Sequence, residues 1–312
     1  MLVATGGDVL ERRDLDLLLA RARRLRITVA LAPSVTPLLT DERVAELRTA
    51  GVKVASISLD GASAATHDRI RGTSGHLEAT LEALRRLRRH GFTVQVNTVV
   101  MRDTVDDLPR VARIVRDLRA SIWEVFFLVP TGRGRSLREL SPDENEDVCR
   151  FLVDASRYGF VVRTVEGPFF RRVRAEHAKG ARAGGRLYER LGRELREELG
   201  APTHATRAQT RSTRDGKGVV FVGHDGSIYP SGFLPLPLGN VRHDDIVAVY
   251  REHPILQRIR AVDFDGRCRV CAYRDLCGGS RARAFAASGD PLGEDPACGY
   301  SPPGWATSGA RA

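Results

Sequence analysis

The chain has 312 residues, of which 42% are hydrophobic, so it can supply the cores of one large α/β domain and a smaller one. Its formal charge is +10, but the arginines alternate with leucines in helical stretches and aromatic residues make up only 6%, which argues against nucleic-acid binding. No apolar run reaches the roughly 18 residues of a membrane span and no secretion signal opens the chain. We therefore expect a cytoplasmic protein with no membrane partner.

Residues 1–165 repeat one pattern, in which a β-rich run is followed by a polar turn and an amphipathic helix. The predicted strands lie within residues 2–7, 27–33, 52–61, 93–100 and 122–130. Helices are predicted over residues 15–24, 39–51 and 76–91, with Thr40 as an N-cap and with Gly51 and Gly91 at helix ends. Strands that alternate with helices predict parallel strands with crossover helices, hence an α/β sheet or barrel.

The composition changes after residue 165. Residues 166–215 are rich in Arg, Gly, Glu and Ala and predict a helix between flexible connectors, which we interpret as an Arg-rich helical linker. A loop-rich region follows over residues 216–312, and within it Asp225-Gly226 is a strong turn signal for a hairpin. The sequence thus predicts three parts, with bounds 1–165, 166–215 and 216–312.

Two neighbouring predicted strands each carry polar residues at alternate positions, and these must share one face of the strand. The residues are Ser56, Ser58 and Asp60 on one strand and Thr93, Gln95 and Asn97 on the next. A closed barrel fills its interior with branched apolar side chains, so polar inner faces favour an open barrel that holds a polar ligand. A solvent-facing position is the alternative, but crossover helices should cover that side. Ligands bind at the C-terminal ends of parallel strands, where Asp60 and Asn97 lie.

Four of the five cysteines, Cys268, Cys271, Cys277 and Cys298, form the pattern C-x2-C-x5-C-x20-C. Four thiolates suit either zinc or an iron–sulfur cluster, and the spacing does not separate these metals. In a reducing compartment such a cluster favours a metal or redox site over disulfides. Cys149 lies in a predicted helix and is expected to be a small buried hydrophobic residue.

The run "CRVCAYRDLCGGSRARAFAASGDPLGEDPAC", residues 268–298, resembles the auxiliary-cluster region of radical S-adenosylmethionine (SAM) enzymes of the SPASM/twitch type. "TGGD" at residues 5–8 resembles the GGE-type motif of that family, and "SLDG" followed by "HDRIRG" also fits it. The nearest subgroups are those of tunicamycin and haem biosynthesis. The resemblance implies a partial (β/α)6 TIM-like barrel lacking its first βα unit over residues 1–165. It also implies a small twitch/SPASM-like iron–sulfur domain over residues 216–312.

The resemblance further implies the cofactors and the residues that bind them. One auxiliary [4Fe–4S] cluster would be held by Cys268, Cys271, Cys277 and Cys298. SAM would be bound at its amino group by Gly6, Gly7 and Asp8, and at its ribose and methionine parts by Ser58, Asp60 and Asn97. An electron donor such as flavodoxin or ferredoxin would serve the enzyme, and the substrate would be a small molecule or a peptide.

One departure from the family is serious, because the C-x3-C-x2-C motif that holds the SAM-binding [4Fe–4S] cluster is absent from the sequence. We therefore expect an N-terminally incomplete chain that is inactive as written. The first hypothesis is a radical SAM oxidoreductase-type enzyme that cleaves SAM reductively and abstracts hydrogen from its substrate. The second is a non-catalytic relative that holds iron–sulfur or zinc, and the third is an α/β protein with a structural zinc knuckle. The sequence nominates no catalytic acid or base.

Overall fold

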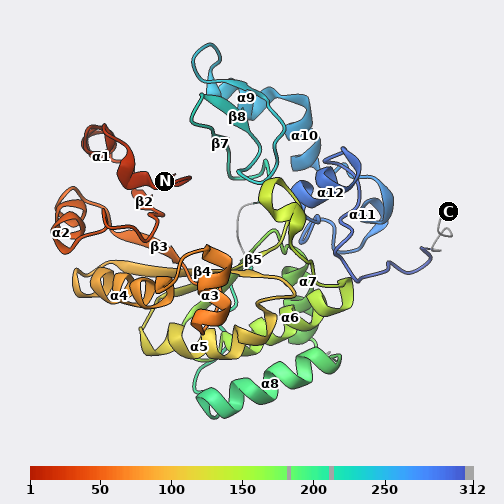
Figure 1. Ribbon diagram of the computed structural model, residues 1–312. Helices are drawn as coiled ribbons and strands as arrows, with labels where there is room; N and C mark the ends of the chain where they lie inside the picture. The colour runs from red at the N-terminus through yellow and green to blue at the C-terminus, as the bar shows by residue number, and fades with distance from the viewer. Residues whose placement is uncertain (181–183, 211–213, 306–312) are drawn as a thin grey trace. The chain divides into compact units, whose positions relative to one another are not determined.

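The computed structural model describes residues 1–180, 184–210 and 214–305 (Figure 1). The chain divides into two compact units. Unit 1 comprises Met1–Phe126, Leu152–Arg163 and Arg190–Ala208, and unit 2 comprises Phe127–Phe151, Thr164–Glu189 and the described part of Gln209–Ala312.

A six-stranded sheet has the strand order β1-β2-β3-β4-β5-β6. Its strands are β1 (Leu2–Ala4), β2 (Val29–Leu31), β3 (Val54–Ser58), β4 (Thr93–Val100), β5 (Ile122–Phe127) and β6 (Val161–Val165). The pairs β1·β2, β2·β3 and β3·β4 are parallel, and the register sets Ser58 beside Asn97. The α/β class is confirmed, and each of the five predicted strand runs contains one strand. The sixth strand was not predicted, although its run of β-branched residues is typical of a strand.

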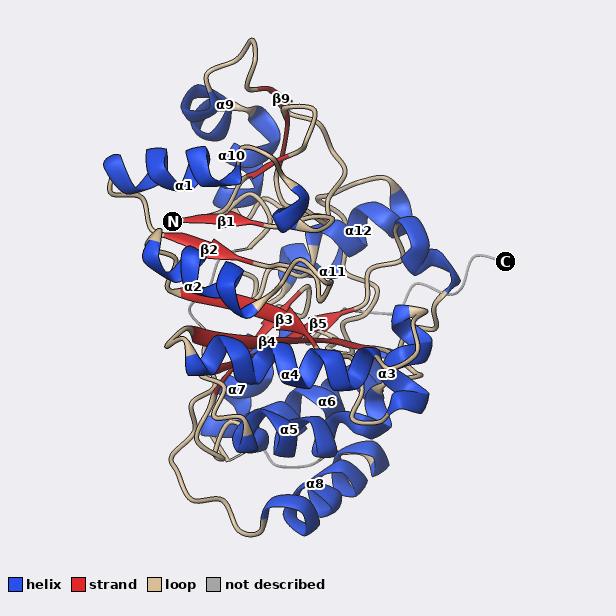
Figure 2. Cartoon of the chain, turned by 60° about the vertical axis from the view of Figure 1, so that its left-hand side comes forward, coloured by secondary structure: helices blue, strands red, loops and turns tan. Residues whose placement is uncertain are grey.

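Helices cover one face of this sheet in unit 1 (Figure 2). They are α1 (Leu15–Arg24), α2 (Asp41–Thr49), α3 (Ala64–Arg71), α4 (His76–Arg89) and α5 (Leu108–Asp117), with short 3-10 turns η1 (Val9–Glu11) and η2 (Val105–Asp107). Thr40 accepts a hydrogen bond from the N–H of Arg43, as expected of an N-cap. Leu84 and Leu87 of α4 are buried, and each buried leucine contributes about 2 kcal/mol. Through these leucines helix α4 packs against β3 and β4.

Unit 2 contains a three-stranded antiparallel sheet and several short helices. The elements are η3 (Gly132–Ser136), α6 (Pro142–Ala155, which ends in unit 1), α7 (Phe169–Ala178), β7 (Phe221–Val222), β8 (Ser227–Tyr229), β9 (Gly239–Asn240), α9 (Ile246–Glu252), α10 (Pro254–Ala261), α11 (Gly266–Val270) and α12 (Arg281–Ser288). The predicted hairpin is confirmed, because β7 and β8 pair across Asp225-Gly226 with Gly226 at φ +88. One hydrophobic core of unit 2 is built around Ile228, Leu256 and Ile259.

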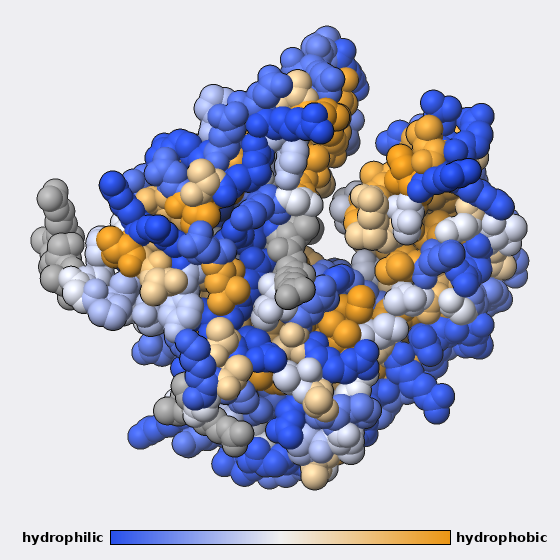
Figure 3. All heavy atoms as spheres, turned by 180° about the vertical axis from the view of Figure 1, so that it is seen from behind, coloured by the Kyte–Doolittle hydropathy of each residue, from blue (hydrophilic) through white to orange (hydrophobic). Residues whose placement is uncertain are grey.

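The predicted linker over residues 166–215 contains α7 and a second helix, α8 (Arg186–Leu199). Residues 181–183 and 211–213 of that segment, and 306–312 of the predicted C-terminal domain, lie outside the described residues. Among the described helices, none has both the length and the apolar character needed to cross a membrane. Hydrophilic residues cover most of the face drawn in Figure 3, where hydrophobic residues form separate patches.

Candidate functional site

The loop after β1 carries the two glycines and the aspartate of the TGGD motif. Gly6 and Gly7 have φ values of +90 and +54, and a Cβ on either would meet no atom within 4 Å. No side chain therefore shields the backbone at these two glycines, so a ligand can approach it closely. Asp8 accepts hydrogen bonds from the N–H of Ser34 at 3.3 Å and from the hydroxyl of Thr36 at 2.7 Å. These bonds tie the loops after β1 and β2 together and fix the carboxylate.

Ser58 and Asn97 occupy paired positions on β3 and β4, so their side chains share one face of the sheet. Both are partly exposed, whereas the alternating residues Ile57 and Val96 are buried on the opposite face. The side-chain oxygen of Asn97 accepts a hydrogen bond from the Gln95 amide at 2.7 Å. The structure therefore brings these two predicted site residues together, with Gln95 holding the amide of Asn97 in place.

Asp60 is only 2% exposed, and its carboxylate is engaged within unit 1. One oxygen accepts the N–H of Val99 at 2.8 Å and the other meets Arg71 at 2.5 Å, while the Asp60 N–H donates to Nδ1 of His67 at 3.0 Å. Burial raises the pKa of Asp60, and the charge of Arg71 opposes that shift. These bonds fix the turn at the end of β3. Arg71 and His67 both lie in the "HDRIRG" run, which was singled out only for its resemblance.

A polar network that the sequence did not predict extends the same face to β5 and β6. The Glu124 carboxylate lies 2.6 Å from Arg163 and accepts a hydrogen bond from Gln95 at 2.7 Å, and Arg163 donates to Gln95 at 2.5 Å. Burial raises the pKa of Glu124 despite the arginine beside it. The sequence does contain a signal for Glu124, because this charged residue stands between the apolar residues Trp123 and Val125 of a strand. In the structure both neighbours are buried and Glu124 lies on the other face.

The four cysteines of the C-terminal pattern line one cavity in unit 2. The other lining residues are Arg172, Arg267, Tyr273, Arg274, Gly278, Gly279, Tyr300 and Pro302. Cys277 is buried and the other three are half-buried. Among the described residues, no three His, Cys, Asp or Glu side chains are grouped as a single metal ion would require. Cys149 is fully buried in α6 and does not line this cavity, in agreement with its expected packing role.

Backbone N–H groups lie beside these sulfur atoms. The N–H of Tyr273 donates to Cys271 at 3.4 Å. Burial has the largest effect on the pKa of Cys277, Cys298 and Cys268, and the backbone N–H groups of Gly279, Tyr300 and Asp295, respectively, act in the opposite direction by favouring the thiolate.

Burial opposes the ionisation of these thiols. It raises the pKa of Cys277 to about 12 and that of Cys298 to about 11, and it also raises the pKa of Cys268. A desolvated thiol ionises only if a positive centre compensates, and a bound metal deprotonates it outright. A donor set of four cysteines that line one cavity therefore fits zinc or an iron–sulfur cluster.

Two buried arginines, Arg172 and Arg281, lie beside the cysteines of this cavity, and the sequence did not assign them. The Arg281 guanidinium lies 4.0 Å from the sulfur of Cys268 and donates to the carbonyls of Pro291 at 2.9 Å and Gly293 at 2.6 Å. Arg172 pairs with Glu146 and with Glu176. The buried Nε of Arg172 has no acceptor in the part of the chain that the structure describes. Because Arg172 lines the cavity, its positive charge favours a negatively charged ligand there.

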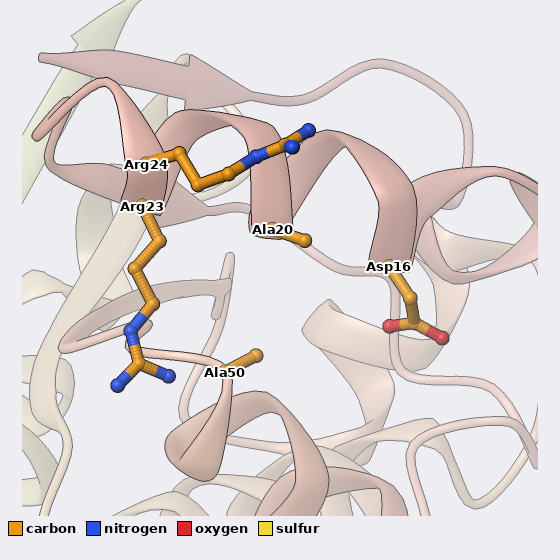
Figure 4. A pocket seen from close by; sticks show the side chains of 5 residues that line it. All are labelled: Asp16, Ala20, Arg23, Arg24 and Ala50. Carbon is orange, nitrogen blue, oxygen red and sulfur yellow. The ribbon is translucent and has the colours of Figure 1, made fainter.

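A second hollow lies in unit 1 (Figure 4). Its lining consists of Asp16, Ala20, Arg23, Arg24 and Ala50. Asp16 is already paired with Arg43 at 2.8 Å, and the hollow opens to solvent beside α1. None of the predicted site residues lines it.

Comparisons with known proteins agree with these features. The Radical SAM superfamily model matches residues 1–115. An AdoMet-dependent heme synthase of Methanosarcina barkeri is 33% identical over 97% of this chain and 83% of its own length, and a pre-heme d1 synthase of Dinoroseobacter shibae is 28% identical over 95% and 73%. A crystal structure of Streptococcus suis SuiB bound to S-adenosylmethionine superposes with a TM-score of 0.65 at 13% identity, covering 96% of this chain and 66% of that one. At that identity the likeness bears on the fold.

Proposed function

Because the chain belongs to the radical SAM superfamily and has relatives named as haem synthases, we propose that it is a radical SAM iron–sulfur enzyme that acts on a haem precursor. The observation that carries the proposal is the 33% identity to such a relative over nearly the whole chain. Reductive cleavage of SAM supplies a radical that abstracts hydrogen from the substrate. An electron donor such as flavodoxin or ferredoxin serves this chemistry.

The SAM site of the proposal lies in unit 1. Gly6 and Gly7 provide bare backbone and Asp8 a carboxylate for the amino group, while Ser58 and Asn97 offer a hydroxyl and an amide to the ribose and methionine parts. The open space beside both glycines and the pairing of Ser58 with Asn97 support this assignment. The resemblance also assigns a SAM contact to Asp60. Because its carboxylate is buried and engaged by Val99 and Arg71, we propose instead that Asp60 supports the site by holding the end of β3.

SAM binding can be measured by equilibrium dialysis of the chain with labelled SAM. We expect Asn97→Ala and Ser58→Ala to weaken binding about tenfold each, the loss of one good hydrogen bond to a charged or polar ligand. Thr49→Ala, which removes an exposed hydroxyl at the end of α2, is the control. Equal affinity in Asn97→Ala and Thr49→Ala would exclude Asn97 from the site.

The proposed auxiliary [4Fe–4S] cluster is held in unit 2 by Cys268, Cys271, Cys277 and Cys298. The cavity that the four cysteines share supports this assignment. Four cysteines suit zinc as well, and membership of the radical SAM superfamily is what favours a cluster here.

Anaerobic reconstitution with iron and sulfide, followed by iron, sulfide and zinc analysis, tests this assignment. We expect about four irons per chain. Cys271→Ala should lose them, and Cys149→Ala, the matched control from α6, should keep them. Zinc without sulfide would replace the cluster by a structural metal site and favour the second candidate, a non-catalytic metal-binding relative.

We also propose that these 312 residues by themselves do not cleave SAM, because they contain no C-x3-C-x2-C motif. The five cysteines are accounted for by the four of the cavity and by buried Cys149. Incubating the reconstituted chain with SAM and dithionite should give no 5′-deoxyadenosine. Its formation above the level of a cluster-free control would contradict this.

A further inference from the structure

Four polar side chains on the neighbouring strands β4, β5 and β6 form one hydrogen-bonded network within unit 1. We name Gln95, Asn97, Glu124 and Arg163 the Gln95 network, after its central residue, which is 6% exposed. Nε2 of Gln95 donates to Oδ1 of Asn97 and to Oε2 of Glu124, both at 2.7 Å. Oε1 of Gln95 accepts from Nη2 of Arg163 at 2.5 Å. Three neighbours thus hold this buried amide.

The donors and acceptors of the network decide which way each amide group points. A guanidinium only donates, so the group of Gln95 that meets Arg163 must be the carbonyl oxygen. The amide nitrogen of Gln95 then faces Glu124 and Asn97, and an amide nitrogen also only donates. Asn97 must therefore present its own oxygen to Gln95. The assignment holds whether or not Glu124 is protonated, because Gln95 supplies the hydrogen in both cases.

This orientation leaves the NH2 group of Asn97 for a ligand. Its oxygen is bound to Gln95, and within the described part of the chain no acceptor bonds to its amide nitrogen. Asn97 is half-buried, and Ser58 is its partner in the register of β3 and β4. An NH2 group has two donors and no acceptor. It therefore suits an oxygen that accepts hydrogen bonds, and it does not suit an ammonium group, which itself only donates.

We propose that the other three members of the Gln95 network are positioning residues that hold the NH2 group of Asn97 toward SAM, where it donates to an accepting oxygen. This inference rests on the proposed SAM site. SAM has accepting oxygens on its ribose and on its methionine carboxylate, and its ammonium group is left to Asp8. Arg163, Glu124 and Gln95 act only through Asn97. An amide that is already oriented before SAM arrives lowers the cost of ordering on binding.

A purely structural role is the alternative for this network. The ion pair of Arg163 with Glu124, at 2.6 Å, would then only stabilise β5 and β6. The two roles differ in their dependence on Asn97. A structural defect weakens SAM binding whatever residue occupies position 97, whereas a positioning defect has no effect once the Asn97 side chain is removed. The energetic coupling between positions 95 and 97 therefore separates the two roles.

Exchanging an amide and a carboxylate tests the proposal. The double variant Gln95→Glu/Glu124→Gln keeps the net charge and the side-chain volumes. The carboxylate at position 95 still accepts from Arg163 but donates nothing, so Asn97 must turn its NH2 group toward position 95 and its oxygen toward the ligand. We expect about tenfold weaker SAM binding in equilibrium dialysis, the loss of one hydrogen bond to a polar ligand.

Two comparisons show that the effect passes through Asn97. Glu124→Gln alone keeps an oxygen that accepts from Gln95, so the orientation of Asn97 is retained and binding should weaken by no more than about threefold. In an Asn97→Ala background the exchange should have no further effect. Equal affinities of the exchange and of Glu124→Gln would overturn the positioning role, and so would an undiminished loss in the Asn97→Ala background. The SAM site itself would stand in both cases.

Asn97→Asp provides a second test that leaves Gln95 and Glu124 in place. It keeps the oxygen that Gln95 binds and removes the donor, so SAM should bind at least about tenfold more weakly. Tighter binding would mean that position 97 faces a positively charged group of SAM, and it would overturn the inference. A parent chain that binds no SAM would overturn the proposed SAM site, and the inference with it.

A second ligand identifies the accepting oxygen. 5′-Methylthioadenosine contains the ribose of SAM but not its methionine carboxylate. If Asn97 donates to the ribose, Asn97→Asp should weaken the binding of both ligands by a similar factor. If it donates to the carboxylate, only the binding of SAM should weaken.

Discussion

Arg281 is a buried charged residue that lies beside a cavity sulfur. Its guanidinium is 1% exposed, lies 4.0 Å from the sulfur of Cys268 and stacks 4.4 Å from the ring centroid of Phe264. A reduced cluster carries one more negative charge than an oxidised one, so a nearby fixed cation stabilises the reduced form.

Arg281→Met should therefore lower the reduction potential of the proposed auxiliary cluster. We expect about a tenfold smaller ratio of reduced to oxidised cluster at a fixed potential, which equals about 59 mV for one electron. Arg283→Met is the control, because Arg283 is equally buried in α12 but bonds to Asp295 and to the carbonyls of Leu128 and Glu166. A potentiometric titration followed by absorbance measures both, and equal shifts would show that Arg281 acts only through packing.

His67 gives unit 1 a pH-dependent stability. Burial lowers its pKa to about 4 from the usual 6.5. Its Nδ1 accepts the Asp60 N–H, and its Nε2 lies 3.0 Å from Nδ1 of His76 and 3.3 Å from the Thr80 hydroxyl. Between pH 6.5 and 4 the unfolded chain binds a proton at this position and the folded chain does not, so stability falls as the pH falls through this window.

The variant His67→Gln isolates this contribution. It removes the titrating group, so the dependence of the free energy of unfolding on pH should flatten between pH 6.5 and 4, by up to about 3 kcal/mol over the window. Urea denaturation at several pH values measures it. A slope identical to that of the parent would mean that His67 titrates normally in the folded state.

At the scale of elements, the loop between Cys277 and α12 depends on Gly279, which has close neighbours. Gly279 has φ +63, and an added Cβ would lie 2.5 Å from a nitrogen of Arg281 and 3.0 Å from Asp295. Gly289, after α12, has φ +76 but open space around it. We expect Gly289→Ala to cost about 1 kcal/mol from backbone strain alone. Gly279→Ala should lower the free energy of unfolding by more than this in urea denaturation, and it should also lower the iron content. An equal loss for both variants would mean that the close packing around Gly279 does not contribute.

The elements also show how far sequence patterns reach. Alternation of strands and helices predicted β1 to β5, because period and capping are local properties, and the C-x2-C spacing identified four cysteines that line one cavity. The pairing of Glu124 with Arg163 joins residues 39 positions apart, and Arg163 lies on the strand that was not predicted. Arg172 reaches its cavity from a helix within the predicted linker. Contacts of this range depend on the fold, which no local pattern contains.

At the scale of the whole molecule, the two candidate sites draw their residues from different units, each with buried apolar residues of its own. A ligand that binds only the folded state stabilises the part of the chain that forms its site. Removing the proposed auxiliary cluster should therefore loosen unit 2 around the four cysteines and α12. Hydrogen bonds from Arg281 to the carbonyls of Pro291 and Gly293 hold this region together. The β3 and β4 strands of unit 1 contribute none of the cavity's lining residues.

Hydrogen exchange with mass spectrometry, before and after removal of iron by a chelator under anaerobic conditions, measures this directly. Peptides from residues 264–300 should exchange at least tenfold faster without iron, because thiols that burial desolvates, among them Cys277 and Cys298, then have no ligand to compensate them. Peptides from residues 54–58 and 93–100 should be unchanged, and Cys271→Ala should reproduce the chelated pattern without the chelator. Faster exchange throughout the chain would instead mean that the metal centre holds the whole fold, and the two sites would then have to be treated as one cooperative structure.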